Sequence, residues 1–114
     1  MASDAQFVAF ICQQMAGAGR VSARKMFGEF AIYHDEKVVA LVTDNQLFVK
    51  PTSAGKTLLG EPVLESPFPG AKPHFLMADL DDPEFLSALI VATAQELPMP
   101  MPKAKAKAPR SVSG

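Results

Sequence analysis

The amino-acid sequence predicts an α+β fold of two layers, in which one helix near each end of the chain packs on an antiparallel sheet. Residues 4–15 and 82–97 repeat apolar side chains at helical spacing, and the runs between them are rich in Val, Ile, Phe and Tyr. A chain of 114 residues is long enough for one domain with its own core. The predicted order is helix, strands, short helix, strands, helix.

The two long helices have recognisable starts. Ser3 or Asp4 can accept a free backbone N–H at the start of the first helix, which we expect to end before Gly17. In the last helix Asp82 is the expected cap, and Pro83 occupies the first helical position, where no backbone donor is needed. Both ends of the folded body are therefore expected to be helical.

Between the helices, apolar runs are separated by turn residues. The four predicted strands are Val21–Phe27, Phe30–His34, Lys37–Thr43 and Gln46–Lys50, with Asp-Glu and Asp-Asn pairs as turns. A short helix capped by Ser53 follows. A weaker hairpin is then expected to pair Val63–Phe68 with His74–Ala78.

The hairpin turns predict which side chains share a face. Two-residue turns place Ile32 opposite Val39, Phe30 opposite Leu41, and Leu41 opposite Phe48, all on the face under the helices. The opposite face would then carry apolar side chains that include Tyr33, Val38, Ala40 and Val42. Such a surface is typical of a site for a protein partner or a second copy. The alternative is that the last helix or the 61–73 loop covers this face.

The composition changes after Leu97. Residues 1–97 are expected to form the domain, and residues 98–114 a disordered tail rich in Pro, Lys and Ala. Residues 1–102 carry a net charge of −5, and the tail carries +4 from Lys103, Lys105, Lys107 and Arg110. The sequence shows no secretory leader and no apolar run of membrane-spanning length, so a cytoplasmic protein is expected.

No residue set predicts catalysis, a cofactor or a metal. Residues 53–57 read Ser-Ala-Gly-Lys-Thr, but Lys50 stands where a phosphate-binding loop needs a glycine. The two histidines and Cys12 lack the paired spacing of a zinc site, and the acidic residues 79–84 match a helix start. The sequence therefore predicts a protein that is not an enzyme.

The most informative segment is 23–33, which reads Ala-Arg-Lys-Met-Phe-Gly-Glu-Phe-Ala-Ile-Tyr. Its key residues are Arg24, Lys25, Met26, Phe27, Gly28 and Tyr33. On a strand, Arg24 and Lys25 point to opposite faces, so at most one belongs to a flat basic patch. They either contact an acidic partner or phosphate, or protect an edge strand from aggregation.

This segment resembles the signature that opens the first sheet of the TfoX/Sxy N-terminal domain family. The resemblance covers about residues 5–97 and is strongest over 23–50, although Glu29 and Ala31 stand where the family tends to have glycine. It implies the two-layer fold, a link to the regulation of natural competence, and no catalytic residue. The expected function is a regulator or adaptor that acts through protein contacts. The alternative is an accessory protein that binds nucleic acid through the basic tail.

The tail gives a testable prediction about nucleic acid. Four positive charges limit the slope of log K against log salt concentration to about −3.6. We expect weak binding that is independent of sequence, largely disappears by ~200 mM salt and is lost when residues 98–114 are removed. Fluorescence anisotropy with two unrelated DNA duplexes measures this. Selective binding that survives the removal would contradict the prediction and direct attention to Arg24 and Lys25.

Overall fold

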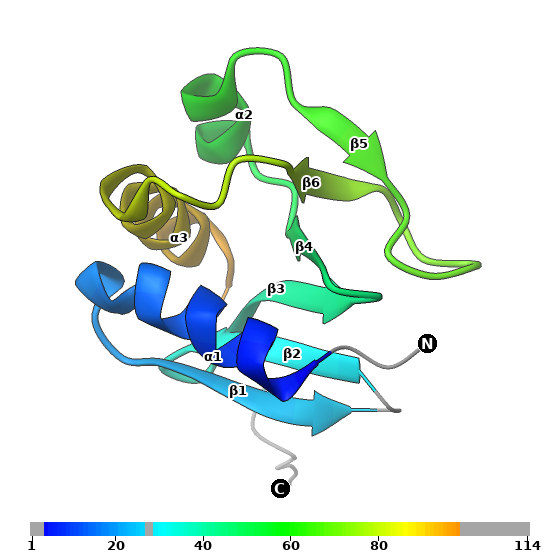
Figure 1. Cartoon of the computed structure of the whole chain (residues 1–114). Coiled ribbons are helices and arrows are strands. Elements are labelled where there is room, and N and C mark those ends of the chain that lie inside the picture. Colours follow the sequence, from blue (N-terminus) through cyan, green and yellow to red (C-terminus); the bar gives the residue numbers. More distant parts are fainter. Residues whose placement is uncertain (1–3, 27–28, 99–114) are drawn as a thin grey trace, which may run out of the picture.

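A computed structural model describes residues 4–26 and 29–98 and confirms the two-layer α+β fold (Figure 1). The helical elements are α1 (Ala5–Gln14), the 3₁₀ turn η1 (Ala16–Ala18), α2 (Ser53–Leu59) and α3 (Pro83–Glu96). The strands are β1 (Val21–Met26), β2 (Glu29–His34), β3 (Lys37–Thr43), β4 (Gln46–Val49), β5 (Val63–Glu65) and β6 (His74–Met77). Phe27, Gly28 and the predicted tail from residue 99 onward lie outside the described residues.

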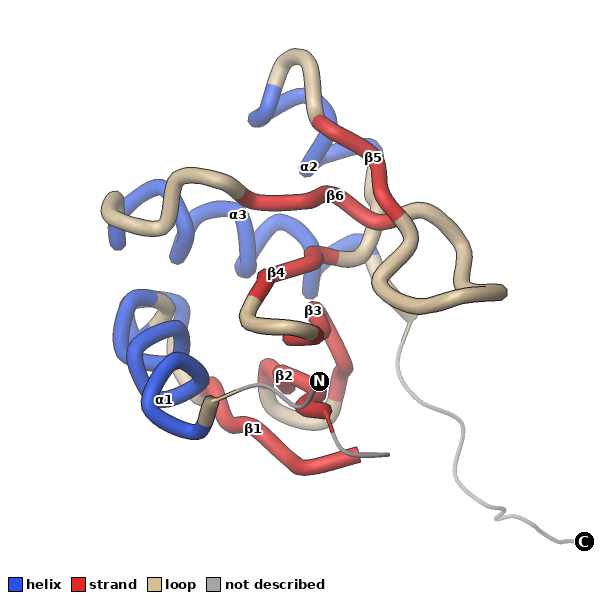
Figure 2. The backbone as a smooth tube through the Cα atoms, turned by 45° about the vertical axis from the view of Figure 1, so that its right-hand side comes forward, coloured by secondary structure: helices blue, strands red, loops and turns tan. Residues whose placement is uncertain are grey.

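The described strands form one antiparallel sheet in the order β1-β2-β3-β4-β6-β5. The helices α1 and α3 lie on one face of it, and the loop between β5 and β6 projects from the opposite side (Figure 2). Fully buried side chains from both layers make the core; they include Ile11, Met15, Ile32, Val42, Leu47, Val49, Leu86, Leu89 and Ile90. Burial of this apolar surface is the main favourable contribution to folding.

The helix caps follow the sequence prediction with one correction. Asp4 Oδ1 accepts a hydrogen bond from the Gln6 backbone N–H at 2.9 Å, and Asp82 Oδ1 accepts one from Phe85 at 3.1 Å. The cap of α2 is Thr52, whose hydroxyl oxygen accepts from the Gly55 N–H at 2.9 Å. The predicted cap, Ser53, is instead the first residue of the helix. Thr52 has the extended backbone that capping residues require.

Gly55 has a packing role that explains the glycine in the Ser-Ala-Gly-Lys-Thr segment. A Cβ atom at this position would lie 2.8 Å from the Thr52 hydroxyl oxygen and 3.1 Å from the Phe75 ring. The glycine therefore lets α2 approach β6 closely. This contact accounts for the residue without any phosphate-binding role.

The β3–β4 turn forms as predicted. Asp44 and Asn45 both have positive φ angles, 53° and 56°, which is the geometry of a two-residue type I′ turn. Thr43 and Gln46 flank it as a pair, and Leu41 lies opposite Phe48 as expected.

The predicted register between β2 and β3 is wrong, because β3 contains a β-bulge. The turn is two residues long, with His34 opposite Lys37, but the pairing shifts between Ile32 and Tyr33. Ala40, not Val39, lies opposite Ile32. Val39 is therefore an additional residue in β3, and no glycine in this strand signals the bulge.

The bulge also corrects the predicted partner face. Side chains alternate along a strand, so one additional residue moves the rest of β3 to the opposite face. Ala40 and Val42 are fully buried in the core under the helices. Tyr33 and Val38 remain on the opposite face, where both are half-buried. A substitution such as Ala40→Arg would thus bury a charge and unfold the protein rather than disrupt an assembly.

The end of α3 is joined to the start of α2 by the carboxylate of Glu96. Its two oxygens accept hydrogen bonds from the backbone N–H groups of Ser53 and Ala54 at 2.8 and 2.9 Å. These bonds stabilise the charged form and lower the pKa of Glu96 below its ordinary value of 4.5. The two helices are therefore connected by a contact that depends on pH.

We predict that this contact is lost in acid. Because the pKa of Glu96 is lower in the folded state, the carboxylate stabilises the fold above the unfolded-state pKa, and this stabilisation is lost as the pH falls through the folded-state pKa. Glu96→Gln should therefore lower the Tm at pH 7, and the difference from the parent should shrink as the pH falls below the ordinary value of 4.5 and through the lower folded-state pKa. Thermal unfolding followed by circular dichroism measures this, with Glu36→Gln in an exposed turn as the control. A difference that stays constant down to pH 3 would contradict the assignment.

Candidate functional site on the outer face of the sheet

The outer face is the side of the sheet turned away from α1 and α3. One row of paired residues crosses all six described strands on this face: Arg24, Ala31, Leu41, Phe48, Leu76 and Val63. Leu41 and Phe48 were predicted to lie under the helices, and the bulge at Val39 places them here instead. Most of the row is apolar, so the outer face is not an ordinary solvated surface.

The loop of residues 66–73 covers part of the outer face. The Thr43 hydroxyl donates a hydrogen bond to the buried Pro67 carbonyl at 2.8 Å. Within the loop, the Ser66 hydroxyl donates to the Ala71 carbonyl at 2.8 Å. Phe48, on β4, is only 3% exposed. The part of the 61–73 loop around Pro67 therefore lies against this face of the sheet, in line with the alternative left open by the sequence.

An apolar groove remains between this loop and strands β1–β3. It has a volume of about 660 Å³, and its apolar lining includes Met26, Phe30, Leu41, Pro67 and Phe68. Phe68 is 53% exposed and Met26 is 38% exposed. Glu29 and Asp44 lie at its edge, and the Asp44 N–H donates to the Glu29 carboxylate at 3.1 Å. The groove thus combines an apolar floor with an acidic edge.

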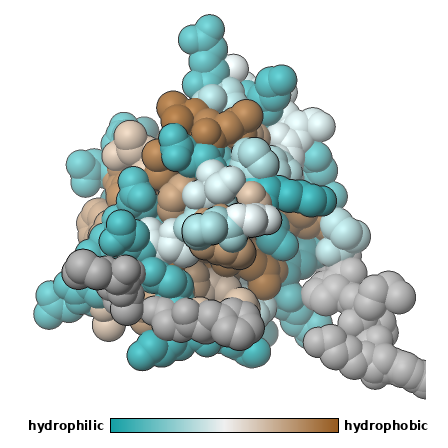
Figure 3. Space-filling view, turned by 90° about the vertical axis from the view of Figure 1, so that its right-hand side faces the viewer, coloured by the Kyte–Doolittle hydropathy of each residue, from teal (hydrophilic) through white to brown (hydrophobic). Residues whose placement is uncertain are grey.

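The molecular surface near the loop is correspondingly mixed. Figure 3 views the side from which β5 and the 66–73 loop project in Figure 1, and apolar side chains (brown) interrupt the hydrophilic surface there. The exposed large apolar residues of these two segments are Val63, Leu64 and Phe68. Exposed apolar groups gathered in this way are characteristic of interaction surfaces.

The described residues of the 23–33 segment are divided between the two faces. The Arg24 guanidinium carbon lies 5.0 Å from the centroid of the Tyr33 ring, a cation–π contact on the outer face. Lys25 is paired with Phe30 and points to the opposite face, as predicted for adjacent strand residues. Met26 lines the groove. Arg24, Tyr33 and Met26 therefore contribute to one surface.

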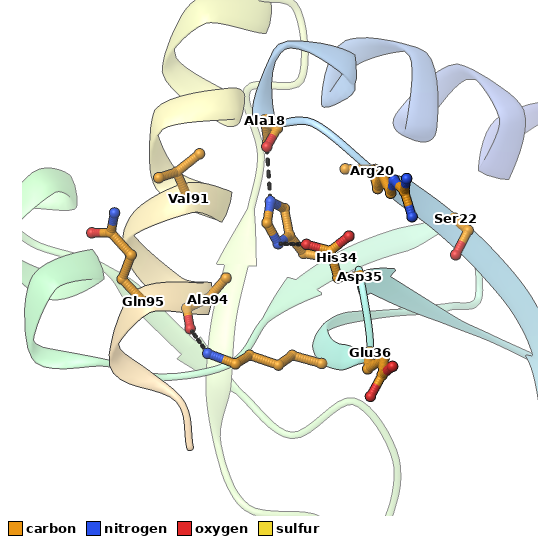
Figure 4. Close-up of a pocket in the computed structure, with 11 residues that line it drawn as sticks. Ala18, Arg20, Ser22, His34, Asp35, Glu36, Val91, Ala94 and Gln95 are labelled. Carbon is orange, nitrogen blue, oxygen red and sulfur yellow. Dashed lines mark hydrogen bonds and ion pairs between the residues drawn. The ribbon is translucent and has the colours of Figure 1, made fainter. Parts of the chain in front are cut away.

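A second pocket, of about 870 Å³, lies where the β2–β3 turn meets η1 and α3 (Figure 4). His34 Nε2 is 2.8 Å from the Ala18 carbonyl oxygen, and His34 Nδ1 is 3.6 Å from the Asp35 carboxylate. The Lys37 ammonium donates to the Ala94 carbonyl at 2.6 Å. His34 and Lys37 thus connect β2 and β3 to the helical layer, and these contacts account for both side chains without a ligand.

The other candidate residues are dispersed. Within residues 4–26 and 29–98, no group of three His, Cys, Asp or Glu side chains could hold a metal ion. Cys12 is half-buried against the core, and burial raises the pKa of its thiol, which disfavours the reactive thiolate. His74 Nδ1 lies 2.8 Å from the Lys72 carbonyl oxygen in the loop. None of the described helices is long and apolar enough to cross a membrane.

Sequence reasoning missed the groove. Phe68 and Pro67 come from a loop whose path over the sheet has no periodic signature, and the position of Leu41 depends on the bulge. A signal was present in Pro67-Phe68-Pro69-Gly70, where a large aromatic residue stands between prolines in a loop. Such a residue has few ways to become buried and is a reasonable candidate for a contact.

These features define a small α+β domain with a helix-covered core and a partly open apolar sheet face. The model of the TfoX N-terminal domain family matches residues 13–97, most of the chain, and the chain belongs to this family. It is also 44% identical over 100 residues to an "uncharacterized 12.7 kDa protein in trpE 5′ region" of Spirochaeta aurantia, a match that covers 86% of each chain.

The Thr43–Pro67 contact gives a prediction about the groove. Thr43→Val keeps the side-chain shape but leaves the buried Pro67 carbonyl without this donor, and should lower the free energy of unfolding by about 1–2 kcal/mol. Urea denaturation measures the change. Thr57→Val removes an exposed hydroxyl that donates to the Ser53 carbonyl at 3.1 Å and should change stability by less than about 0.5 kcal/mol. Equal effects of the two substitutions would argue against the anchoring role of Thr43.

Proposed function

We propose that this protein is a non-enzymatic regulator or adaptor of the competence type, and that it acts by binding a protein partner in the outer-face groove. The family suggests the competence-related class. The groove supports the mode of action, because it leaves Phe68 and Met26 substantially exposed beside an apolar floor. This is the observation on which the proposal depends.

The chemistry of the groove indicates the kind of partner segment that fits. Its floor accepts an apolar or aromatic side chain, which would bury Met26 and Phe68 on binding. Its acidic edge, formed by Glu29 and Asp44, favours a partner with Lys or Arg next to that apolar side chain. The proposed partner segment is therefore apolar and flanked by basic residues.

The Arg24–Tyr33 pair extends this surface along β1 and β2. Stacking on the ring restricts the guanidinium, so little conformational entropy is lost if it also contacts a partner. Arg and Tyr are among the residues most enriched at the energetic centres of protein interfaces. We include both side chains in the proposed binding surface.

A catalytic role has less support. The half-buried Cys12 has a raised thiol pKa, and His34 and Lys37 in the larger pocket contact backbone carbonyls of η1 and α3. No described nucleophile is paired with a base in the arrangement that acyl or phosphoryl transfer requires. The proposal therefore assigns binding, and not chemistry, to this domain.

Binding can be tested with two groove variants and a matched control. Phe68→Glu and Met26→Glu replace exposed groove residues, so the fold should be retained, and each should weaken partner binding at least about tenfold. Phe10→Glu replaces a side chain of α1 that is 37% exposed and should leave binding unchanged. Quantitative affinity capture from extracts of the native host identifies proteins that depend on the groove, and titration of the purified partner then measures Kd.

Two outcomes would contradict the proposal. One is that all three variants recover the same proteins in the same amounts. The other is that binding falls equally with Phe10→Glu, which would indicate nonspecific apolar adsorption. Sedimentation of the full chain at ~100 µM separately determines whether a second copy occupies the groove; in that case Phe68→Glu, but not Phe10→Glu, should dissociate the oligomer.

A further inference from the structure

The free edge of β5 is a second exposed apolar feature, distinct from the groove. Among the strands of residues 4–26 and 29–98, β5 pairs only with β6 and stands at the end of the sheet. Val63 is 56% exposed and Leu64 is 55% exposed, although their side chains point to opposite faces of the sheet. All three residues of this strand are exposed.

The opposite edge of the sheet differs. β1 carries Arg24 and Lys25, and exposed charges on an edge strand oppose pairing with another strand. β5 has no charge at its first two positions; its nearest charges are Glu65, at its end, and Glu61, two residues before its start. The β5 edge therefore offers unpaired backbone groups and apolar side chains between two carboxylates.

A segment of the same chain has the matching spacing. Residues 103–107 read Lys-Ala-Lys-Ala-Lys, with a basic residue at every second position. In an extended strand this period of two places all three lysines on one face and both alanines on the other. Glu61, Val63 and Glu65 have the same spacing in the sequence; Val63 and Glu65 belong to β5, and Glu61 lies in the bend that leads into it. If Lys103 and Lys107 lie beside the two carboxylates, Lys105 lies beside Val63. The aliphatic part of the Lys105 side chain can then cover Val63.

The chain is long enough for this contact to form within one molecule. The hydrogen bonds from Ser53 and Ala54 hold Glu96 at the start of α2. The seven-residue helix α2 is about 10 Å long. With the length of the Glu96 side chain and of the turn after α2 added, Glu96 and Glu61 are separated by roughly 20 Å. The seven residues from Glu96 to Lys103 can span up to about 23 Å.

We propose that residues 103–107 add to the free edge of β5 as a seventh strand of the same molecule's sheet. The strand runs parallel to β5, with Lys103 beside Glu61, Lys105 beside Val63 and Lys107 beside Glu65. Backbone hydrogen bonds to the unpaired edge hold it, and the charge difference between body and tail, −5 against +4, favours it. This inference does not depend on the proposed function of the groove.

A second copy of β5 fits this edge less well. If two copies of β5 paired antiparallel about Val63, Glu61 of each copy would lie opposite Glu65 of the other. The two-fold symmetry would produce this pair of like charges twice. Like charges directly opposite each other destabilise a strand pair. The basic segment instead supplies the opposite charge at both positions. A segment bound at this edge would also prevent the exposed apolar strand from pairing with a strand of another molecule.

Carbodiimide cross-linking of the full chain tests the proposal directly, because it joins only lysines and carboxylates in contact. Mass spectrometry should find Lys103 joined to Glu61 and Lys107 joined to Glu65. Exposed carboxylates elsewhere, such as Glu36 and Asp81, provide the control. In a mixture of ¹⁴N- and ¹⁵N-labelled protein these cross-links should be confined to single molecules.

Hydrogen exchange with charge variants of the full chain gives an independent measurement. Replacing Lys103 and Lys107 by Glu should accelerate exchange of residues 63–65 at least about threefold, since repulsion replaces attraction at both ends. Adding Glu61→Lys and Glu65→Lys to these two changes exchanges the charges across the pair and should restore protection. Protection should also fall in ~0.5 M salt, which screens exposed pairs.

Three results would overturn the proposal. The first is cross-linking of the tail lysines to Glu36 and Asp81 as often as to Glu61 and Glu65. The second is cross-links between differently labelled molecules, which would mean that the segment occupies the edge of another copy. The third is exchange of residues 63–65 that is unchanged by the charge reversal, which would show that the β5 edge is not covered by residues 103–107.

Discussion

The β-bulge at Val39 is the constraint on which the arrangement of this protein depends. Alternation in a strand is strict, so one additional residue in β3 determines which side chains of β3 face the helices. β4 pairs with the part of β3 that follows the bulge, so the bulge also determines which β4 side chains face the helices. The core therefore receives Val42 and Leu47, and the outer face receives Leu41 and Phe48.

The outer face then has apolar side chains that need cover, and the 66–73 loop supplies only part of it. The loop is held to the sheet by the hydrogen bond from Thr43 to Pro67, and it places Phe68 beside the open half of the face. This hydrogen bond holds the loop beside the apolar face, and the groove lies between the loop and the strands. The same interaction thus protects Phe48 and creates the surface to which we assign partner binding.

The contact between α2 and α3 determines where the last helix of the domain ends. Glu96 is the last residue of α3, and its carboxylate is bonded to the start of α2. α2 leads within a few residues to β5, so the end of α3 lies about one short helix away from β5. An acidic body and a basic tail connected in this way favour contacts within the molecule.

The sequence by itself determined the local structure. Apolar periodicity located the helices and strands, Asp4 and Asp82 identified two caps, and Asp44-Asn45 identified the type I′ turn, because these features depend on neighbours within a few residues. The residues of the 23–33 segment likewise identified the family. Phe27 and Gly28, in the middle of that segment, lie outside the described residues.

Only the tertiary structure decided which face of the sheet is open and where the groove lies. Val38, Val39 and Ala40 are all apolar, so this part of β3 places apolar side chains on both faces of the sheet in any register. No polar residue in the sequence therefore reveals the bulge. The path of the loop that carries Phe68 is likewise held by the hydrogen bond between Pro67 and Thr43, 24 positions earlier in the chain. Local patterns cannot encode these features, because each is set by packing between residues that are distant in sequence.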